Sequence, residues 1–148
     1  MIPRAYITAW RASAPWATDV QVEQDLVLAR TIVAVFADAN LSDLVAFRGG
    51  TALHKLFLPT PARYSEDIDL VQLTAGSIGP VFSHLRAVLD PWLGEPKRHL
   101  GPAGASLIYR GSSTTPPVQP IRVKIEINTR EHVAVLGCER RRFSVDSP

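Results

Sequence analysis

The sequence contains a single cysteine, Cys138, among its 148 residues. One cysteine cannot form an internal disulfide, and it cannot supply the several thiolates of a cysteine-based zinc site. No apolar run approaches the roughly 18 residues that a membrane-spanning helix needs. The first residues lack the charged region and apolar stretch of a secretory signal. We therefore expect a cytoplasmic protein with no membrane partner.

Aromatic residues are also few, at 7%, but hydrophobic residues make up 46% of the chain and charged residues 20%. This composition is typical of a globular protein rather than a disordered one. A chain of 148 residues can bury one substantial core and is too short for two comfortable domains. We expect residues 1–148 to form a single domain.

The formal net charge of +2 hides an asymmetry. Residues 1–96 contain seven Lys or Arg and ten Asp or Glu, which gives −3, whereas residues 97–148 contain nine and four, which gives +5. A basic second half beside an acidic cluster fits a protein that holds a polyanion while its carboxylates hold a metal. A solvated basic surface explains the same charge, so charge supports this hypothesis without discriminating it.

Hydrophobic periodicity predicts alternating helices and strands. Thr18 and Gln21 form a capping box at the start of the first long helix, and residues 121–128 alternate between apolar and polar residues as a half-buried strand does. The predicted helices are 18–38, 51–58 and 77–93, and the predicted strands are 44–47, 64–73, 105–110 and 121–128. Residues 94–104 and 111–120 are expected to be loops. This order predicts a mixed α/β sheet with helices packed on it.

A di-glycine turn, Gly49-Gly50, follows the first predicted strand, and Thr51 opens a helix. Backbone N–H groups in such a turn can approach a ligand without obstruction by a Cβ atom. The start of the helix favours an anion. Because most Gly-Gly pairs are simply turns, this segment alone does not establish a phosphate site.

Asp67 and Asp69 are two residues apart in a predicted strand, so their carboxylates point from the same face. Like charges on one face repel unless a cation is present, and Mg²⁺ binds one or two carboxylates together with water and substrate phosphates. The alternative is an exposed pair of aspartates with salt bridges to Arg63 or Arg48.

Glu126 lies on the polar face of the last predicted strand. If that strand pairs beside the Asp67–Asp69 strand, three carboxylates converge on one or two metal ions, as in two-metal sites. Lys124 and Arg122 share this face, so an ordinary ion pair explains Glu126 equally well.

Two segments together, FRGGTALHK at residues 47–55 and RYSEDIDL at residues 63–70, resemble the AbiEii/AbiGii-type toxin branch of the nucleotidyltransferase superfamily. The wider fold of that superfamily is the DNA polymerase β palm. The similarity runs from near Gln21 to the end of the chain. It implies an α+β, nucleotidyltransferase-like mixed β-sheet with helices packed on it.

The resemblance also implies roles for individual residues. Gly49, Gly50 and Thr51 would cradle the triphosphate of a nucleoside triphosphate, and Lys55 and Arg63 would meet phosphate or position the loop. The catalytic and metal-binding carboxylates would be Asp67, Asp69 and Glu126, with Mg²⁺ or Mn²⁺ as the ion. The expected acceptor is an RNA such as the 3′ end of tRNA, and the expected partner is a cognate antitoxin.

This toxin branch normally continues into a C-terminal helical region that supplies an essential lysine and a further aspartate, and residues 1–148 lack that region. We therefore expect residues 1–148 to be an N-terminal fragment of a longer protein, inactive alone. The alternatives are a truncated, inactive module that binds nucleotide or antitoxin, and a metal-dependent phosphohydrolase.

Overall fold

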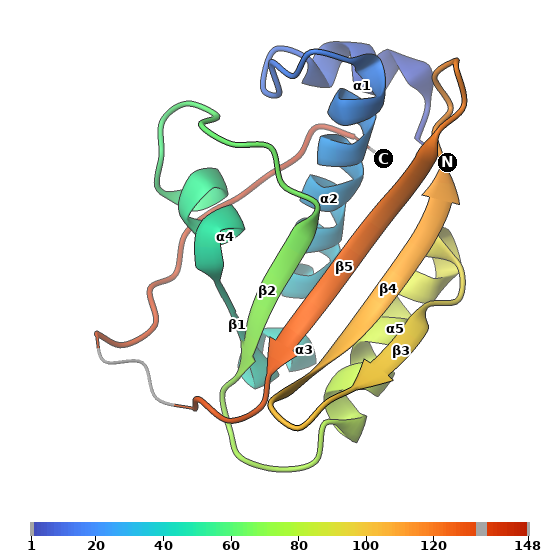
Figure 1. Cartoon of the computed structure of the whole chain (residues 1–148). Helices are drawn as coiled ribbons and strands as arrows, with labels where there is room; N and C mark the ends of the chain where they lie inside the picture. The colour runs from blue at the N-terminus through green and yellow to red at the C-terminus, as the bar shows by residue number, and fades with distance from the viewer. Residues whose placement is uncertain (1, 133–135, 148) are drawn as a thin grey trace.

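The computed structural model describes residues 2–132 and 136–147. Within them, five strands form one sheet: β1 Val45–Arg48, β2 Asp67–Gln72, β3 Lys97–Leu100, β4 Gly104–Ser112 and β5 Pro120–Asn128. Their order across the sheet is β1-β2-β5-β4-β3 (Figure 1). The pair β2 and β5 is parallel and the other neighbours are antiparallel, so the sheet is mixed. The predicted fold class is confirmed.

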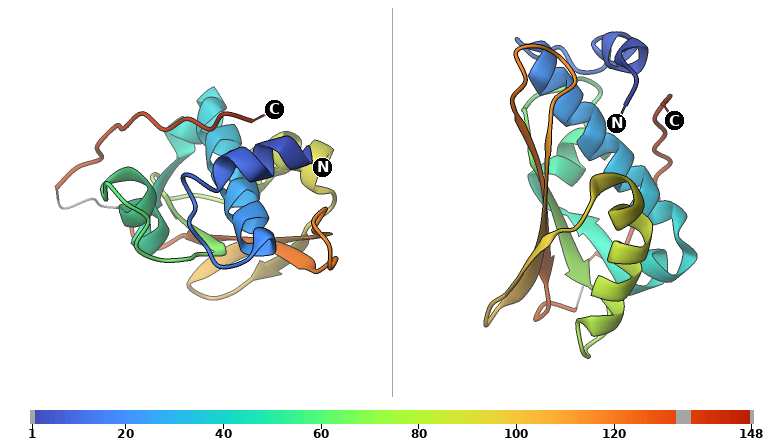
Figure 2. Two further views of the ribbon diagram at one scale, coloured as in Figure 1. Left: turned by 90° about the horizontal axis from the view of Figure 1, so that it is seen from above. Right: turned by 90° about the vertical axis from the view of Figure 1, so that its right-hand side faces the viewer.

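The described helices are α1 Arg4–Trp10, α2 Asp19–Ala37, α3 Ala39–Leu44, α4 Gly49–Leu56 and α5 Gly79–Leu93. The helices α2 and α5 cover one face of the sheet, and α1 lies across the start of α2 (Figures 1 and 2). In the part of the chain that the structure describes, no helix covers the opposite face (Figure 2, right). No described helix combines the length and the apolar character that crossing a membrane would require.

The central helix α2 begins where the capping box predicted. The Thr18 side chain accepts a bond from the Gln21 N–H at 3.2 Å, and the Thr18 N–H donates to Gln21 Oε1 at 3.1 Å. The helix lies between the sheet, α1 and α5, and therefore buries more than one apolar stripe. Even its polar residues Glu23, Gln24 and Asp25 are at most 3% exposed.

The alternation predicted for the two site-bearing strands is confirmed. In β5 the side chains of Ile121, Val123, Ile125 and Ile127 are buried in the core, and the polar residues between them are half-buried on the other face. In β2, Ile68 and Leu70 are buried and Asp67 and Asp69 are half-buried. Both strands therefore turn their carboxylates away from the helices.

Three described elements were not predicted. Residues 4–10 and 39–44 form α1 and α3, which are short helices with little periodicity, and Asp38 begins α3 by accepting a bond from the Leu41 N–H at 2.8 Å. Residues 97–100, expected in a loop, form β3, an edge strand whose four residues are all exposed and show no apolar alternation. The predicted strand 64–73 begins at Asp67, and the predicted helix 51–58 begins at Gly49 and ends at Leu56.

Candidate active site

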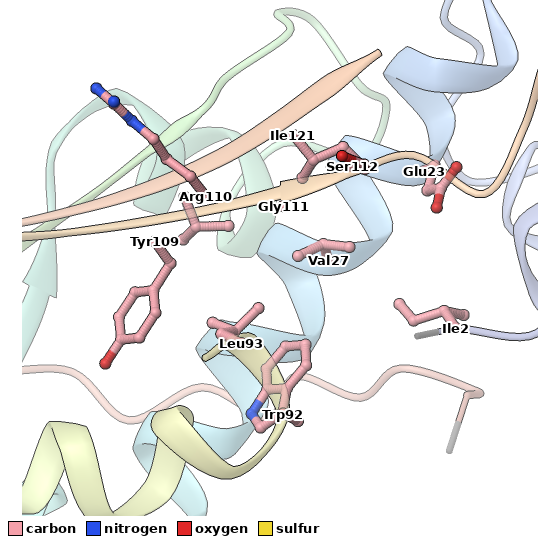
Figure 3. Close-up of a pocket in the computed structure, with 11 residues that line it drawn as sticks. Ile2, Glu23, Val27, Trp92, Leu93, Tyr109, Arg110, Gly111, Ser112 and Ile121 are labelled. Carbon is pink, nitrogen blue, oxygen red and sulfur yellow. The ribbon is translucent and has the colours of Figure 1, made fainter. Parts of the chain in front are cut away.

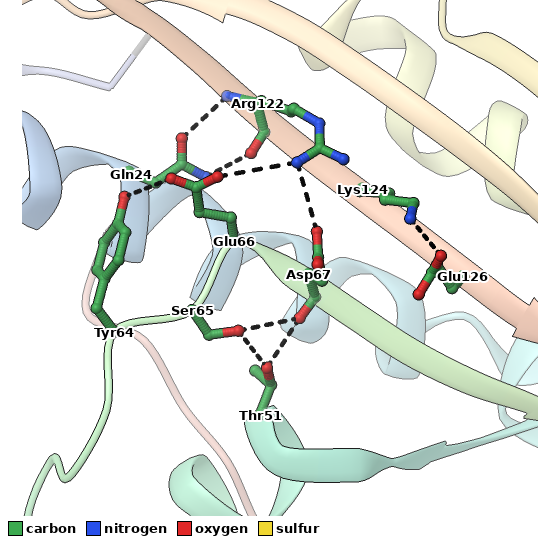
Figure 4. Close-up of polar contacts among 9 residues, drawn as sticks. All are labelled: Gln24, Thr51, Tyr64, Ser65, Glu66, Asp67, Arg122, Lys124 and Glu126. Carbon is green, nitrogen blue, oxygen red and sulfur yellow. Dashed lines mark hydrogen bonds and ion pairs between the residues drawn. The ribbon is translucent and has the colours of Figure 1, made fainter.

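The register of the parallel strands β2 and β5 brings two of the candidate carboxylates together. Asp69 lies beside Glu126, and Asp67 lies beside Lys124. All four side chains are on the sheet face that lacks described helices, where Asp67 and Glu126 project from neighbouring strands (Figure 4). The strand pairing on which the role of Glu126 depended is therefore present.

The di-glycine turn lies against the same carboxylates. Gly49 has a φ of +81°, a left-handed conformation that glycine adopts without steric cost. A Cβ atom on Gly49 would lie 2.6 Å from Asp69 Oδ2 and 3.2 Å from the Asp69 Cβ. The turn therefore needs glycine twice, for its backbone conformation and for its contact with Asp69.

Thr51 fastens the start of α4 to the start of β2. Its hydroxyl donates to the Asp67 carbonyl at 2.9 Å and shares a short hydrogen bond with the Ser65 hydroxyl (Figure 4). Because Thr51 is buried, this contact fixes where the turn lies relative to Asp67.

Arg63 brings a positive charge to the turn. A Cβ atom on Gly50 would lie 3.2 Å from Arg63 Nη1, so the guanidinium borders the second glycine directly. Arg63 is exposed, and its charge is available to an anion bound over the turn.

Lys55 lies elsewhere. Its ammonium donates to both oxygens of Asp25 at 2.8 Å, and Asp25 also accepts from Trp10 Nε1 at 2.7 Å. The side chains of Lys55 and Asp25 are only 7% and 2% exposed. This contact ties α4 to α2 and α1, and favours positioning over direct phosphate contact, the two roles considered for Lys55 from the sequence.

His54 holds the segment that follows α4. Its Nδ1 accepts a hydrogen bond from the Ala62 N–H at 3.1 Å, so the ring is neutral with its proton on Nε2. Burial lowers the pKa of His54, and the positive charges of Lys55 and Arg63 lower it further, against an opposing effect of Asp25. This hydrogen bond joins the buried His54 of α4 to Ala62 in the segment that precedes β2.

The outward cations of β5 pair with the candidate carboxylates. Arg122 Nη1 lies 3.7 Å from Asp67 Oδ1 and 3.8 Å from Glu66 Oε2, and Lys124 contacts Glu126 (Figure 4). The partner of Asp67 is thus Arg122 and not Arg63 or Arg48. The ion pair considered for Glu126 is present.

Burial and the crowding of carboxylates on this face raise the pKa of Asp69. Burial raises the pKa of Asp69, and repulsion from Glu126 and then from Asp67 raises it further, whereas Arg48 opposes the shift. A cation among these groups would relieve both the desolvation and the repulsion.

The carboxylates fit a divalent cation by their chemistry and by one unsatisfied atom. Asp67 Oδ1 is buried and has no hydrogen-bond partner within the described chain, and carboxylate oxygens are the ligands that Mg²⁺ and Mn²⁺ prefer. The described residues do not hold three or more His, Cys, Asp or Glu side chains in a metal-binding arrangement. The structure thus brings Asp69 and Glu126 together without the full three-carboxylate convergence.

A cavity of about 220 Å³ lies on the helix-covered side of the sheet, between α2, the end of α5, β4 and β5 (Figure 3). Trp92, Tyr109 and Val123 are among its lining residues, and none of the residues predicted for the site lines it. The carboxylates and the turn lie on the opposite face.

Comparison with known proteins gives a family. The family model described as "Nucleotidyl transferase AbiEii toxin, Type IV TA system" matches residues 30–147. The chain belongs to the AbiEii nucleotidyltransferase toxin family. This match contains all the predicted site residues and begins after Gln24 and Asp25. A search of curated proteins found no match.

Solved structures show the same fold as this AbiEii-family chain. The nucleotidyltransferase toxin MenT4 of Mycobacterium tuberculosis H37Rv superposes with a TM-score of 0.56 at 18% identity, covering 88% of this chain and 44% of that one. JHP933 of Helicobacter pylori gives 0.55 at 17% identity, covering 84% and 50%. A putative nucleotidyltransferase of H. pylori gives 0.51 at 18% identity, covering 80% and 49%. The chain spans half or less of the length of these structures.

Sequence reasoning missed several residues that hold the elements of the candidate site in place. Gln24 donates to the Arg122 carbonyl at 2.6 Å and accepts from the Arg122 N–H at 3.0 Å, replacing a strand partner where β5 extends beyond β2. Ser65 and Asp25 likewise act through partners distant in sequence. No signal in the sequence indicated this contact, because the predicted strand 64–73 was longer than the predicted strand 121–128, whereas in the structure β5 is the longer strand and its backbone groups need a further partner.

Proposed function

We propose that this AbiEii-family protein is a toxin that transfers a nucleotide from a nucleoside triphosphate to an RNA acceptor, such as the 3′ end of a tRNA, and that a cognate antitoxin restrains it. Family membership supports the reaction class. The observation that carries the proposal is the close contact between the di-glycine turn and the Asp69 carboxylate. A Cβ atom added to Gly49 would lie only 2.6 Å from Asp69 Oδ2. Triphosphate and RNA are found in the cytoplasm, where we expect the protein to act.

In this proposal the triphosphate lies over the turn. The first four N–H groups of a helix have no acceptor within it, and α4 starts at Gly49, so the amides of Gly49, Gly50 and Thr51 are suited to phosphate oxygens. Arg63, beside Gly50, adds a positive charge. Lys55 acts indirectly, by fixing α4 against Asp25.

Asp67, Asp69 and Glu126 would hold Mg²⁺ or Mn²⁺. When bound, such an ion neutralises charge on the transferring phosphate and on the leaving pyrophosphate. Glu126 also has a second proposed role, accepting the proton of the acceptor hydroxyl, because it is 46% exposed next to Asp69. Arg122 and Lys124 neutralise the carboxylates in the nucleotide-free protein.

The test is to incubate a chain extended beyond residue 148 with Mg²⁺, RNA and each of the four triphosphates in turn, and to analyse RNA 3′ ends by mass spectrometry. We expect one triphosphate to add nucleotide, and Asp69→Asn to abolish the addition. Release of nucleoside monophosphate or free phosphate without RNA extension would identify a phosphohydrolase and refute the proposal. Binding of radiolabelled antitoxin is a separate readout of the toxin assignment.

We further propose that residues 1–148 are one folded domain and form the N-terminal part of a longer enzyme that needs the remainder for turnover. The coverage of only 44–50% of the solved neighbours supports this. Equal turnover by residues 1–148 and by an extended chain would refute it.

The second candidate function is a module that binds nucleotide or antitoxin without transfer. The pairing of Asp67 with Arg122 and of Glu126 with Lys124 favours it, because both carboxylates have cationic partners within the chain. Asp67→Ala distinguishes the two functions when made in an extended chain. If the variant loses both its cellular toxicity and its Mg²⁺-dependent nucleotide binding, the transferase is supported. Unchanged toxicity supports the module.

A further inference from the structure

The face of the sheet that carries the carboxylates changes sign from one edge to the other. Its outward positions on β3, β4 and β5 include four cations, which together we call the cationic face: Lys97, Arg110, Arg122 and Lys124. Arg110 pairs with Arg122 across the β4–β5 ladder, and Ile108 pairs with both Lys124 and Lys97. Directly paired residues share a face, so the four cations lie on one side of the sheet.

The side chains confirm this assignment at both strands beyond β5. Arg110 and its neighbour Tyr109 point to opposite sides of β4, with Tyr109 on the helix side (Figure 3). On β3, the Arg98 guanidinium lies 6.0 Å from the centre of the Phe82 ring of α5, on the helix side, and Lys97 therefore faces the other way. Both Lys97 and Arg110 are exposed.

Acidic groups on this face are confined to the region near β2. Among the described outward positions of β3, β4 and β5, the only carboxylate is that of Glu126, beside Asp69. Three strand spacings, about 14 Å in total, separate β2 from β3. Because the two cations of β5 already pair with carboxylates, a polyanion lying across the cationic face would meet attraction mainly from Lys97 and Arg110 on β3 and β4, and it would end at the carboxylates.

We propose that the cationic face binds the sugar–phosphate backbone of a single-stranded polynucleotide and leads its 3′ end to Asp69 and Glu126. The identification of this polynucleotide as RNA rests on the proposed function. The proposal that the face binds a polynucleotide rests on the four cations and their positions on the sheet. Charge complementarity identifies the occupant, and the half-buried Ile108 between Lys97 and Lys124 offers an apolar contact for a sugar or base. A protein partner would need acidic groups spaced to match the same four cations.

Lys97 and Arg98 provide a matched pair of variants, because they are adjacent in β3 and face opposite sides of the sheet. We would measure the fluorescence anisotropy of a labelled single-stranded RNA 12-mer, without nucleotide or divalent ion, over a series of salt concentrations. For single strands, each phosphate contact contributes about 0.7 to the slope of log K against log salt, or about fivefold in affinity at 0.1 M salt. We expect Lys97→Gln to weaken binding by this factor and Arg98→Gln to leave it unchanged.

Arg110→Gln is the second variant, and we expect it to behave as Lys97→Gln does. Equal effects of Lys97→Gln and Arg98→Gln, or wild-type binding by Arg110→Gln, would overturn the proposal. Single-stranded DNA of the same sequence is the other arm of the experiment. Tighter binding of RNA supports the RNA assignment, and equal or tighter binding of DNA overturns that assignment while the polynucleotide surface stands.

The result can be separated from the proposed function because binding is measured without transfer. If no triphosphate extends RNA but Lys97 and Arg98 still differ, the transferase proposal fails and the surface stands. If extension occurs and the two variants bind equally, the surface fails and the transferase proposal stands.

Discussion

Gly49→Ala tests the contact between turn and carboxylate, and Gly94→Ala is its control. Both glycines have a φ of +81°, but Gly94 has no atom within 4 Å of a would-be Cβ, whereas Gly49 has Asp69 Oδ2 at 2.6 Å. Gly49→Ala suffers the backbone cost of a left-handed residue, about 1–2 kcal/mol. Gly94 has a ψ of −168°, in a region that is essentially restricted to glycine, so Gly94→Ala costs about 1–3 kcal/mol. Only Gly49→Ala also forces a neighbour to move.

The neighbour that moves is Asp69. Its carboxylate is the end of a side chain and can turn away, but its Cβ would still lie 3.2 Å from the new methyl group. We therefore take a steric cost at the low end of the range for overpacking, about 1 kcal/mol. With about 3 °C of melting temperature per kcal/mol for a chain of this size, Gly94→Ala should lower the melting temperature by about 3–9 °C. Gly49→Ala should lower it by about 6–9 °C.

The functional difference should be larger than the difference in stability. Turning the Asp69 carboxylate away displaces it from the turn, and a displacement of about 1 Å in an active site can reduce the rate about 100-fold. We expect this loss of RNA extension for Gly49→Ala and near-normal extension for Gly94→Ala, both measured in the extended chain by mass spectrometry at equal folded fraction. Equal rates of RNA extension for the two variants would refute the argument.

Three further outcomes are expected. Asp25→Asn should destabilise the fold by about 3–5 kcal/mol in urea unfolding, because it leaves the Lys55 ammonium buried and unpaired. The double variant Asp25→Leu/Lys55→Met should cost only about 1–3 kcal/mol, because it removes the buried charge but also removes the acceptor of Trp10 Nε1. A cost below about 1 kcal/mol for the single variant contradicts this. Asp69→Asn should abolish transfer and raise the melting temperature at pH 7. The gain in melting temperature should shrink as pH falls towards 3.8, because the folded-state pKa of Asp69 is raised from 3.8. A lower melting temperature of the variant at pH 7 would contradict this expectation. The pKa of His54 in the folded protein is lowered from 6.5. The neutral ring therefore contributes its whole stabilisation of the fold above pH 6.5, and this contribution is lost as pH falls from 6.5 through the folded-state pKa. Below pH 6.5, His54→Asn should reduce the slope of the unfolding free energy against pH by up to about 1.4 kcal/mol per pH unit. An unchanged slope would show that the pKa of His54 does not differ between the folded and unfolded states.

Features set by local periodicity were predictable from the sequence. The Thr18–Gln21 capping box, the alternation of β5 and the common face of Asp67 and Asp69 each depend on residues a few positions apart. Elements without such a pattern were missed. The strand β3, with residues Lys97–Leu100 all exposed, is a strand only because β4 offers it an edge.

The contacts that position the site depend instead on partners distant in sequence. Gln24 and Arg122 are 98 residues apart, and Asp25 and Lys55 are 30 apart. In the sequence, Gln24 and Asp25 look like ordinary polar residues of an amphipathic helix, because periodicity cannot show that the helix is surrounded. Their burial follows from where α1, α4 and β5 lie, which is decided by the tertiary fold.

The position of Glu126 beside Asp69 is itself a consequence of core packing. Ile68 and Leu70 on β2 and Ile125 and Ile127 on β5 are at most 1% exposed, and they pair in the same register that aligns the two carboxylates. A shift of one residue between the strands would place an isoleucine on the open face and a carboxylate in the core, at a cost of several kcal/mol for an unpaired buried charge. Burial raises the pKa of Asp69 most, and the apolar face enforces the repulsion from Glu126 that raises it further, because the carboxylates cannot separate. A site built in this way holds its acidic groups in place before any cation binds, because the energy that keeps them together comes from the opposite side of the same two strands.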